Sequence, residues 1–318
     1  MPDEGHRQGR IEPRPLLAIG LKIASVAIFV GMSTCIKAVG QIPSGQVVFY
    51  RSLIAVVPIL IFLAWRGELR TAFHTERPVS HVVRGLVGVT SMWFSFLGIM
   101  LLPLPEAITI SYAQPLLVVV LGAVLLGETV RFYRWSAVVV GLVGVVIVAW
   151  PNLTLFTSGE GLAASQSLGV MAMLLSAAIS AVVVLLVRRL VLTEKSSTIV
   201  LWFSLTASAL ALFTIPFGWA SLTPQQYMLL VGAGLCGGIA QIMMTESYRY
   251  ADVSVIAPFE YTSMLLGIAA GYLFFAEVPT IYMIVGGLIV VASGIFIVWR
   301  ERRLGLERGK ARKVIPPQ

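Results

Sequence analysis

Long apolar segments separated by short polar connections make up most of the chain. A membrane-spanning helix needs about 20 mostly apolar residues, because the hydrocarbon core is about 30 Å thick. Ten segments meet this requirement: 17–38, 46–65, 82–101, 105–126, 132–150, 168–187, 197–217, 225–246, 253–275 and 280–299. Several connections have only a few residues, so neighbouring helices are expected to pack antiparallel. The pattern predicts an all-α integral membrane protein with ten transmembrane helices.

The composition indicates a lipid environment rather than a water-facing surface. Apolar residues make up 58% of the 318 residues and charged residues 12%, with a mean hydropathy of +0.90. Soluble domains carry about 25% charged residues, so the length does not indicate two soluble domains. The first apolar segment follows Arg7, Arg10 and Arg14, as in a signal peptide. It is longer than the apolar core of a signal peptide, which has about 7–15 residues, so we expect an uncleaved first span.

The basic residues are distributed unevenly between the two sides of the membrane that this span order defines. Twenty of the 23 lysines and arginines, Arg84 among them, are assigned to the tails and to the connections on the N-terminal side. The opposite connections contain none, and Lys22, Lys37 and Arg51 fall within spans. Since cytoplasmic segments are enriched in lysine and arginine, both termini are expected in the cytoplasm of a bacterial inner membrane. The net charge of +8 then reflects topology, and no nucleic-acid partner is expected.

The fourth and ninth apolar segments begin and end alike. Each opens beside an acidic residue, Glu106 or Asp252, and these lie 146 positions apart. Each ends at a glutamate, Glu128 or Glu277, and these lie 149 positions apart. Because each half has five segments, the second half must cross the membrane in the opposite sense. Such inverted repeats occur in many secondary transporters, which hold the substrate near the midplane where the repeats meet.

The repeat divides the chain into five parts. These are a cytoplasmic tail (1–15), a first five-helix repeat (16–150), an external linker (151–167), a second five-helix repeat (168–299) and a basic cytoplasmic tail (300–318). The fifth and tenth segments are rich in glycine, which allows close helix packing. That packing could serve the core of a monomer or the interface of a homodimer, and the sequence leaves both open.

Several short motifs carry a resemblance to a known family: FYR at 49–51, LPEA at 104–107, GE at 127–128, APFEYT at 257–262 and AEVP at 276–279. Over residues 15–300 the chain resembles the ten-span, EamA-type branch of the drug/metabolite transporter superfamily. Within it, segments 14–22, 66–69 and 101–106 are most similar to rhizobial-type riboflavin uptake transporters, and also to S-adenosylmethionine transporters. The resemblance implies secondary transport, with riboflavin uptake as the first substrate. Import or export of S-adenosylmethionine, amino acids or other small metabolites is the alternative.

Two basic residues near the outer ends of spans are candidates for substrate binding. Arg51 lies about 8 Å into the second span, at 1.5 Å per residue, where a guanidinium needs water or a partner. It could face a substrate cavity, or it could extend to the outer headgroups, and the neighbouring Tyr50 suits either role. Lys37 lies on the same side and could join Arg51 or serve as an interfacial anchor. Lys22, near the inner end of the first span, is expected to be an ordinary anchor.

Glu260 is the principal acidic candidate within the membrane. It lies about 12 Å into the ninth span, so an ionised carboxylate there needs a partner. It could bind substrate, relay a proton, or pair with Arg249 or Arg51. Glu106 and Asp252 follow helix starts, where an acid accepts hydrogen bonds from free backbone N–H groups.

Polar and aromatic residues of the third, fourth, eighth and ninth spans could line a cavity. Proline interrupts two of these spans, at Pro115 and Pro258, and such breaks are tolerated where they face protein or water. Rings and amides at these places would suit an aromatic ligand such as a flavin. The candidates are Trp93, Tyr112, Gln114, Gln241 and Tyr261, with Ser91, Phe94 and Tyr248. Each could instead pack in the core or face lipid.

The sequence lacks the motifs expected of several functional classes. No phosphate-binding GxxxxGK[ST] motif occurs, so transport would be secondary or facilitated. The three histidines lie in or beside cytoplasmic segments, and no HExxH motif occurs, so no metal and no cofactor are expected. Only two aspartates occur, so the sequence does not contain the paired-aspartate motifs of intramembrane enzymes. An intramembrane enzyme or a channel is the rival class, and neither the catalytic clusters of the first nor a filter loop of the second is found.

Overall fold

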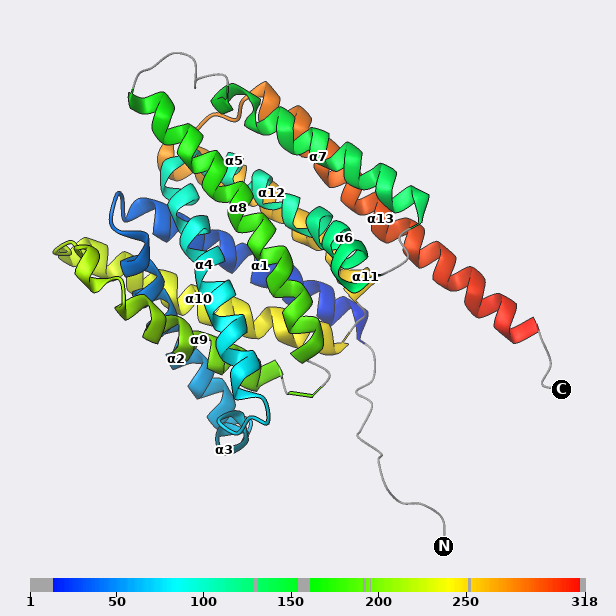
Figure 1. The fold of residues 1–318 in the computed structure, drawn as a ribbon, viewed down its shortest axis with the longest axis horizontal. Coiled ribbons are helices and arrows are strands. Elements are labelled where there is room, and N and C mark those ends of the chain that lie inside the picture. The colour runs from blue at the N-terminus through cyan, green and yellow to red at the C-terminus, as the bar shows by residue number, and fades with distance from the viewer. Residues whose placement is uncertain are drawn as a thin grey trace, which may run out of the picture.

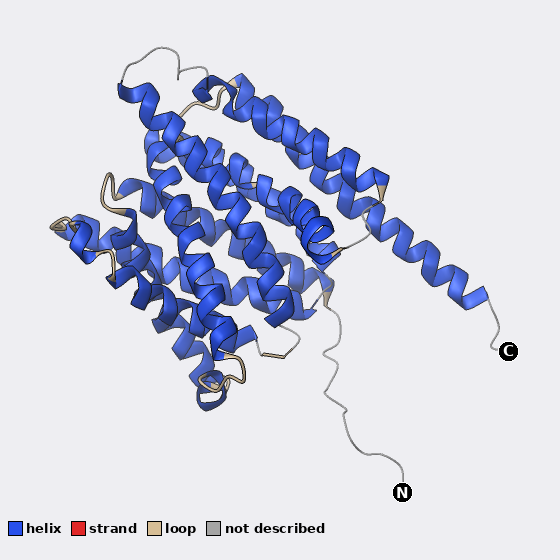
Figure 2. Ribbon diagram, viewed as in Figure 1, coloured by secondary structure: helices blue, strands red, loops and turns tan. Residues whose placement is uncertain are grey.

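The computed structural model describes residues 14–127, 131–153, 161–190, 193–194, 196–250 and 253–314. Within these ranges the regular structure is helical and no strand occurs (Figure 2). The predicted all-α class is therefore confirmed. The helices form one bundle in which most elements run roughly alongside one another (Figure 1).

The elements follow the chain in this order: α1 (Pro15–Ala38), α2 (Ser44–Trp65), α3 (Leu69–Ala72), α4 (Pro78–Leu101), α5 (Leu104–Ser111), α6 (Ala113–Leu126), α7 (Phe132–Leu153), α8 (Gly161–Leu190), α9 (Ser196–Leu212), η2 (Ile215–Phe217), α10 (Pro224–Tyr250), α11 (Val253–Ile256), η3 (Ala257–Tyr261), α12 (Thr262–Phe275) and α13 (Ile281–Val314).

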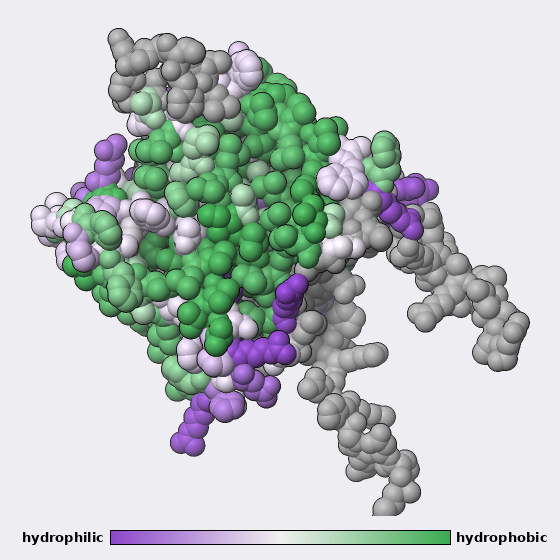
Figure 3. All heavy atoms as spheres, viewed as in Figure 1, coloured by the Kyte–Doolittle hydropathy of each residue, from purple (hydrophilic) through white to green (hydrophobic). Residues whose placement is uncertain are grey.

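Eight helical segments of the described chain are long and apolar enough to cross a membrane, and they coincide with eight of the ten predicted segments. They are Pro15–Ala38, Ser44–Trp65, Pro78–Leu101, Leu104–Leu125, Phe132–Pro151, Ala164–Val187, Pro224–Ser247 and Ile281–Arg300. The chain is thus a multi-pass membrane protein. Figure 3 shows its flank as a broad apolar surface with hydrophilic residues towards the ends.

The other two predicted segments differ from uninterrupted spans. The segment predicted at 197–217 forms a shorter apolar helix, Ser197–Leu212. Pro216 then lies in the first turn of η2, and Gly218 is left-handed at φ +87°, so the helix does not continue. The segment predicted at 253–275 is divided into α11, η3 and α12. Pro258 lies in η3, where its missing N–H and its ring prevent regular α-helix.

The fourth predicted span has a matching break. Helix α5 ends at Ser111 and α6 begins at Ala113, so Tyr112 marks the bend just as Tyr261 marks the bend before α12. Helices α6 and α12 each have 14 residues and each ends at a left-handed residue, Gly127 with φ +64° and Ala276 with φ +53°. The similarity of their ends, seen first in the sequence, thus extends to local backbone structure. Glu128 and Asp252 lie outside the described residues.

Helix pairing joins the two halves of the chain throughout. Helix α1 packs on α10, α4 packs on α8, and α2 packs on both α9 and α10. Helix α7 lies along α13, the green and red pair of Figure 1. Gly144 and Gly286 meet there: a Cβ on Gly144 would lie 2.8 Å from the Gly286 carbonyl oxygen. The glycines of the fifth and tenth segments therefore pack against each other within one chain.

Contacts at the helix ends define two opposite ends of the bundle. The backbone N–H of Arg14, just before α1, donates to the carbonyl of Tyr250, the last residue of α10 (3.0 Å). The far end of α1 lies beside the end of α4, where Lys37 Nζ donates to the carbonyl of Leu102. These two ends are called inner and outer below, following the charge distribution of the sequence.

Candidate functional site

A cavity of about 250 Å³ lies between the two halves of the bundle. Helices α1, α2, α4, α5 and α6 of the first half and α8 and α9 of the second contribute to its lining. We call it the central cavity. Its polar lining residues are Arg51, Ser91, Ser95, Ser111, Gln114, Ser176 and Ser180, and Met32, Phe96 and Phe203 are among its apolar ones. No acidic residue is among the described residues that line it.

Arg51 brings a guanidinium to this cavity. It lies seven residues after the start of α2 and is only 6% exposed. Its Nε donates to Met32 Sδ (3.5 Å), a weak acceptor. The backbone of α10 approaches closely at Gly237, where a Cβ would lie 2.9 Å from Arg51 Nε. Arg51 is thus buried between α1, α2 and α10 rather than extended to the outer surface, and among the described residues it has no acidic partner.

Arg84 is a second cation within a span, half-buried, and its placement corrects the sequence assignment to a cytoplasmic connection. It lies in α4, and its Cζ is 3.8 Å from the centre of the Phe203 ring. Its Nε and Nη1 atoms are buried without a hydrogen-bond partner. Arg84, Gly88, Ser91 and Ser95 follow the i, i+4, i+7, i+11 spacing of one helix face, and the last three line the central cavity.

A serine cluster joins α4 to α8 at the cavity wall. Ser91 Oγ donates to the Ser176 carbonyl (3.0 Å), and Ser176 Oγ donates to the Ser91 carbonyl (2.8 Å). The hydroxyl of Ser91 also lies 2.5 Å from that of Ser180. Hydroxyl groups rotate and both donate and accept, so this wall can exchange these bonds for bonds to a ligand.

The other candidates of the fourth and ninth spans take two different places. Gln114, which follows the bend at Tyr112, lines the central cavity. Tyr112 is buried, shares a hydrogen bond with Ser263 Oγ (2.5 Å) and lies edge-on to Tyr261, with ring centres 5.1 Å apart. Tyr261 packs against α13 at Gly294. The two tyrosines thus join the two broken spans to each other.

The outer candidates form contacts near the membrane surface. Lys37 Nζ lies 2.8 Å from Glu277 Oε1, and Glu277 Oε2 accepts from the backbone N–H of Leu104 (2.8 Å). These bonds tie the ends of α1, α5 and α12 together. Tyr50 lies in an aromatic cluster with Phe49, Trp219 and Tyr227, its hydroxyl 3.4 Å from that of Tyr227. Neither Lys37 nor Tyr50 is among the residues that line the central cavity.

Glu260 forms an ion pair with Lys22 of α1 and not with Arg51, and the side chain of Arg249, the other partner expected from the sequence, lies outside the described residues. Lys22 is 2% exposed and is therefore no surface anchor. Gln241 lies in α10 and is half-buried, while Trp93 is 44% exposed on the flank and stacks with Phe94 at 5.4 Å. Neither of these two lines the central cavity.

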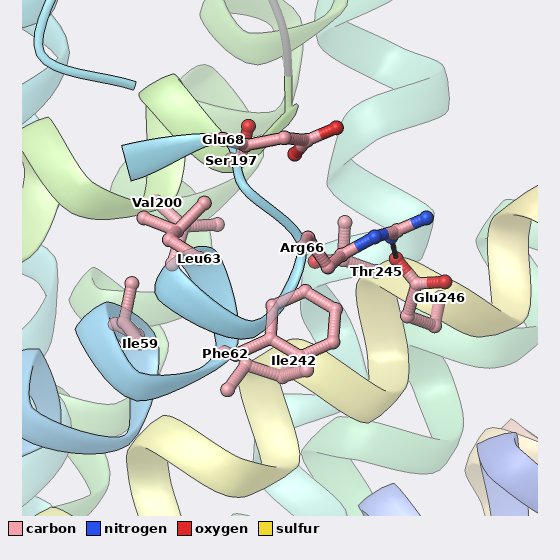
Figure 4. A pocket seen from close by; sticks show the side chains of 10 residues that line it. All are labelled: Ile59, Phe62, Leu63, Arg66, Glu68, Ser197, Val200, Ile242, Thr245 and Glu246. Carbon is pink, nitrogen blue, oxygen red and sulfur yellow. Dashed lines mark hydrogen bonds and ion pairs between the residues drawn. The ribbon is translucent and has the colours of Figure 1, made fainter. Parts of the chain in front are cut away.

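A second cavity, of about 260 Å³, lies towards the inner end between α2, α9 and α10 (Figure 4). Arg66 Nη1 and Glu246 Oε1 form an ion pair of 2.7 Å at its wall, with Phe62 beneath the guanidinium. The charge of this arginine is therefore balanced within the protein, unlike those of Arg51 and Arg84. Among the described residues, no group of three or more His, Cys, Asp or Glu side chains is placed to hold a metal ion.

The chain was compared with known proteins. The model of a family described as "EamA-like transporter family" matches residues 16–150 and 167–299. An S-adenosylmethionine uptake transporter of Rickettsia prowazekii is 25% identical, over 83% of this chain and 85% of its own. A riboflavin transporter of Rhizobium johnstonii is 28% identical, over 82% of this chain and 83% of its own. A solved crystal structure, 21% identical, covers 90% of this chain and 97% of its own at a TM-score of 0.64, which concerns the fold alone.

Proposed function

The chain belongs to the EamA-like transporter family, and on this premise we propose that it is a secondary transporter that carries a small metabolite through the central cavity. The family and the names of the relatives indicate a transporter rather than an enzyme. One observation carries the proposal: a polar cavity that contains a buried guanidinium lies between helices of both halves. Substrate sites of secondary transporters lie at such places.

The proposed architecture is that of ten spans in two inverted five-helix repeats, 16–150 and 168–299, joined by the external linker 151–167. The pairing of helices supports it. The first span packs on the eighth (α1 on α10) and the third on the sixth (α4 on α8), and each pair becomes the other when the halves are exchanged. The matching bends at Tyr112 and Tyr261, each followed by a 14-residue helix, support it as well.

We place the protein in the bacterial inner membrane with both termini in the cytoplasm. The relatives named above come from bacteria. The contact between Arg14 and Tyr250 brings the start of the first span and the end of the eighth to the same side, as an even number of crossings requires. The basic residues of the connections gather on that side, in agreement with the preference of lysine and arginine for the cytoplasm.

Alternating access requires contacts between the halves that open in turn at each end. The ion pair of Lys37 with Glu277 lies at the outer end, and the ion pair of Lys22 with Glu260 lies towards the other end of α1. In each pair the lysine belongs to the first half and the glutamate to the second. We propose that these pairs close the two ends of the pathway and that one of them separates in each open state.

Riboflavin uptake is the first substrate to test. The resemblance in the sequence and the name of the Rhizobium relative support it. S-adenosylmethionine is the alternative, supported by the name of the Rickettsia relative. The cavity favours the flavin, because S-adenosylmethionine carries a cationic sulfonium that the buried guanidinium of Arg51 would repel. The carbonyl oxygens of a flavin would accept hydrogen bonds from Arg51, and its rings would pack against Phe96 and Phe203.

Uptake of labelled riboflavin by a riboflavin auxotroph expressing the chain tests this substrate. Growth at low riboflavin is expected, and no growth despite correct membrane insertion would exclude the flavin. Labelled S-adenosylmethionine, tested in parallel in the same membranes, decides the alternative. Counterflow in proteoliposomes separates a carrier from a channel, because only a carrier is stimulated by substrate on the opposite side.

A further inference from the structure

The central cavity holds the buried guanidinium of Arg51, and a second cation, Arg84, stacks on the lining residue Phe203; neither forms an ion pair with an acid among the described residues. Arg51 donates from Nε only to a thioether, and its side chain is in no ion pair among the described residues. Arg84 has two buried nitrogens without a partner and stacks on Phe203, a lining residue. Three other basic residues within spans or at their ends each form an ion pair with a glutamate: Lys22 with Glu260, Lys37 with Glu277, and Arg66 with Glu246.

Such an arrangement is unfavourable unless a counter-charge arrives from outside the protein. A buried charge costs several kcal/mol when it is not paired, and arginine remains protonated even when it is buried. The pairing of Arg84 with the face of Phe203 offsets part of this cost, but a ring cannot neutralise two cations. Two acids of the second half are already paired, Glu260 with Lys22 and Glu277 with Lys37, and the buried Glu106 is in no ion pair with Arg51 or Arg84 among the described contacts.

We propose that an anion binds in the central cavity against Arg51, at the wall formed by Phe203 and the helix face that also carries Arg84. The proposal rests on the proposed function in that it uses the same cavity. Guanidinium groups bind carboxylate and phosphate oxygens with strong, charge-assisted hydrogen bonds, and the hydroxyls of Ser91 and Ser180 and the amide of Gln114 add neutral donors at the same wall. The anion is either a carboxylate or phosphate group of the transported metabolite, or an inorganic anion that accompanies a neutral substrate.

Anion binding is measured first, without any transport. Purified full-length protein is melted in sodium methanesulfonate, whose anion is neither a carboxylate nor a phosphate, with chloride, phosphate or malate replacing it at constant ionic strength. Because a ligand that binds the native state stabilises it by mass action, we expect Tm to rise and saturate with at least one of these anions. In Arg51→Gln and Arg84→Gln, the anion concentration that gives half of the full Tm rise should increase roughly tenfold or more. This is the effect expected on removing one charge-assisted pair.

Arg70→Gln is the matched control, because Arg70 is exposed in α3, a helix that contributes no residue to the lining of the central cavity. It should retain the wild-type response. If Arg84→Gln does not fold, Arg84→Lys takes its place in the experiment. It keeps a positive charge at the site and should therefore show a weakened rise of Tm. An equal rise of Tm in the wild type and in both glutamine variants, or no rise with any of the anions, would overturn the proposal.

Transport assays then distinguish the two sources of the anion. If it is inorganic, riboflavin counterflow in proteoliposomes will require chloride or phosphate and will fall at least tenfold in methanesulfonate. If it belongs to the metabolite, malate or flavin mononucleotide will compete with chloride for binding, and riboflavin will not. Anion binding without counterflow of any tested substrate would count against the proposed function alone, whereas counterflow without anion binding would count against this inference alone.

Discussion

Lys37 of α1 and Glu277, which follows α12, form an ion pair of 2.8 Å that joins the first half of the chain to the second at the outer end. Both side chains are largely buried, at 12% and 18% exposure. The carboxylate also accepts the N–H of Leu104 at the start of α5. This contact holds three elements together at the end where an outward-open state would have to separate them.

Replacing Lys37 with Met should destabilise this outer contact. The change leaves the half-buried carboxylate of Glu277 with one partner fewer, at a cost of about 1–3 kcal/mol. We expect a lower Tm and faster labelling of a cysteine introduced at Ser95 by a reagent added from outside. The double variant Lys37→Met/Glu277→Gln should recover part of the loss, because no unpaired charge remains. Unchanged Tm and labelling in Lys37→Met would mean that the ion pair does not close this end.

Glu260→Gln tests the pair with Lys22. The variant removes the negative charge but keeps the shape of the side chain, so the buried Lys22 loses its ion pair with Glu260. Substrate uptake should fall roughly tenfold or more, which corresponds to about 1.4 kcal/mol or more on the limiting step. The amount of protein in the membrane should not change. Wild-type uptake at wild-type protein level would assign Glu260 a structural role only.

The contact of Gly144 with Gly286 predicts a steric effect within one chain. Gly144→Ala places a methyl group 2.8 Å from the carbonyl oxygen of Gly286, and overpacking of this kind costs about 1–3 kcal/mol. Gly20→Ala is the matched control, because nothing lies within 4 Å of its new Cβ. Tm should fall in the first variant and stay level or rise in the second. Equal Tm values with a change in oligomeric state would instead assign the glycines to a dimer interface.

The contacts of Glu194, which lies in a connection outside the spans, predict that the stability of the fold depends on pH. Although burial opposes it, hydrogen bonds from Thr75 Oγ1 (2.6 Å) and from the backbone N–H groups of Glu76 and Arg77 lower the pKa of Glu194. A carboxylate with a depressed pKa in the folded state stabilises the fold above its unfolded-state pKa, about 4.3, and this stability is lost as pH falls through the folded pKa.

Glu194→Gln should therefore lower Tm at pH 7, and this effect should become smaller as the pH falls below the unfolded-state pKa of about 4.3. Glu76→Gln, a change at an exposed side chain in the connection that bonds to Glu194 through its backbone, is the control and should show no such dependence. A Tm difference between wild type and Glu194→Gln that stays constant from pH 7 to pH 3 would contradict the assignment of this stability to the ionised carboxylate.

Much of the fold could be predicted from the sequence, because lipid imposes a strict length and polarity on each span. Eight segments agree with the structure, and the breaks at Pro115 and Pro258 follow from the chemistry of proline. The shortening after Leu212 was harder to predict, because the apolar pattern continues through Phe213 and Ile215 while Pro216 and Gly218 end the helix.

The candidate site could be predicted only in part. Arg51 and Gln114 were selected because each is polar at membrane depth, and both line the central cavity. Arg84 was assigned to a connection because it lies close to the predicted span end, although its spacing from Gly88, Ser91 and Ser95 on one helix face was a usable signal. The partners of Lys22 and Tyr112 could not be predicted, because those contacts join segments more than 140 residues apart.

Counterflow in proteoliposomes tests the central claim most directly, that the cavity containing Arg51 is the substrate site of a carrier. Vesicles loaded with unlabelled riboflavin or S-adenosylmethionine are diluted into the same compound with a radiolabel, for the wild type, Arg51→Gln and the surface control Arg70→Gln. We predict transient accumulation of label with one of the two substrates in the wild type and the control, and at least a tenfold loss in Arg51→Gln. Equal accumulation in all three proteins would contradict the account.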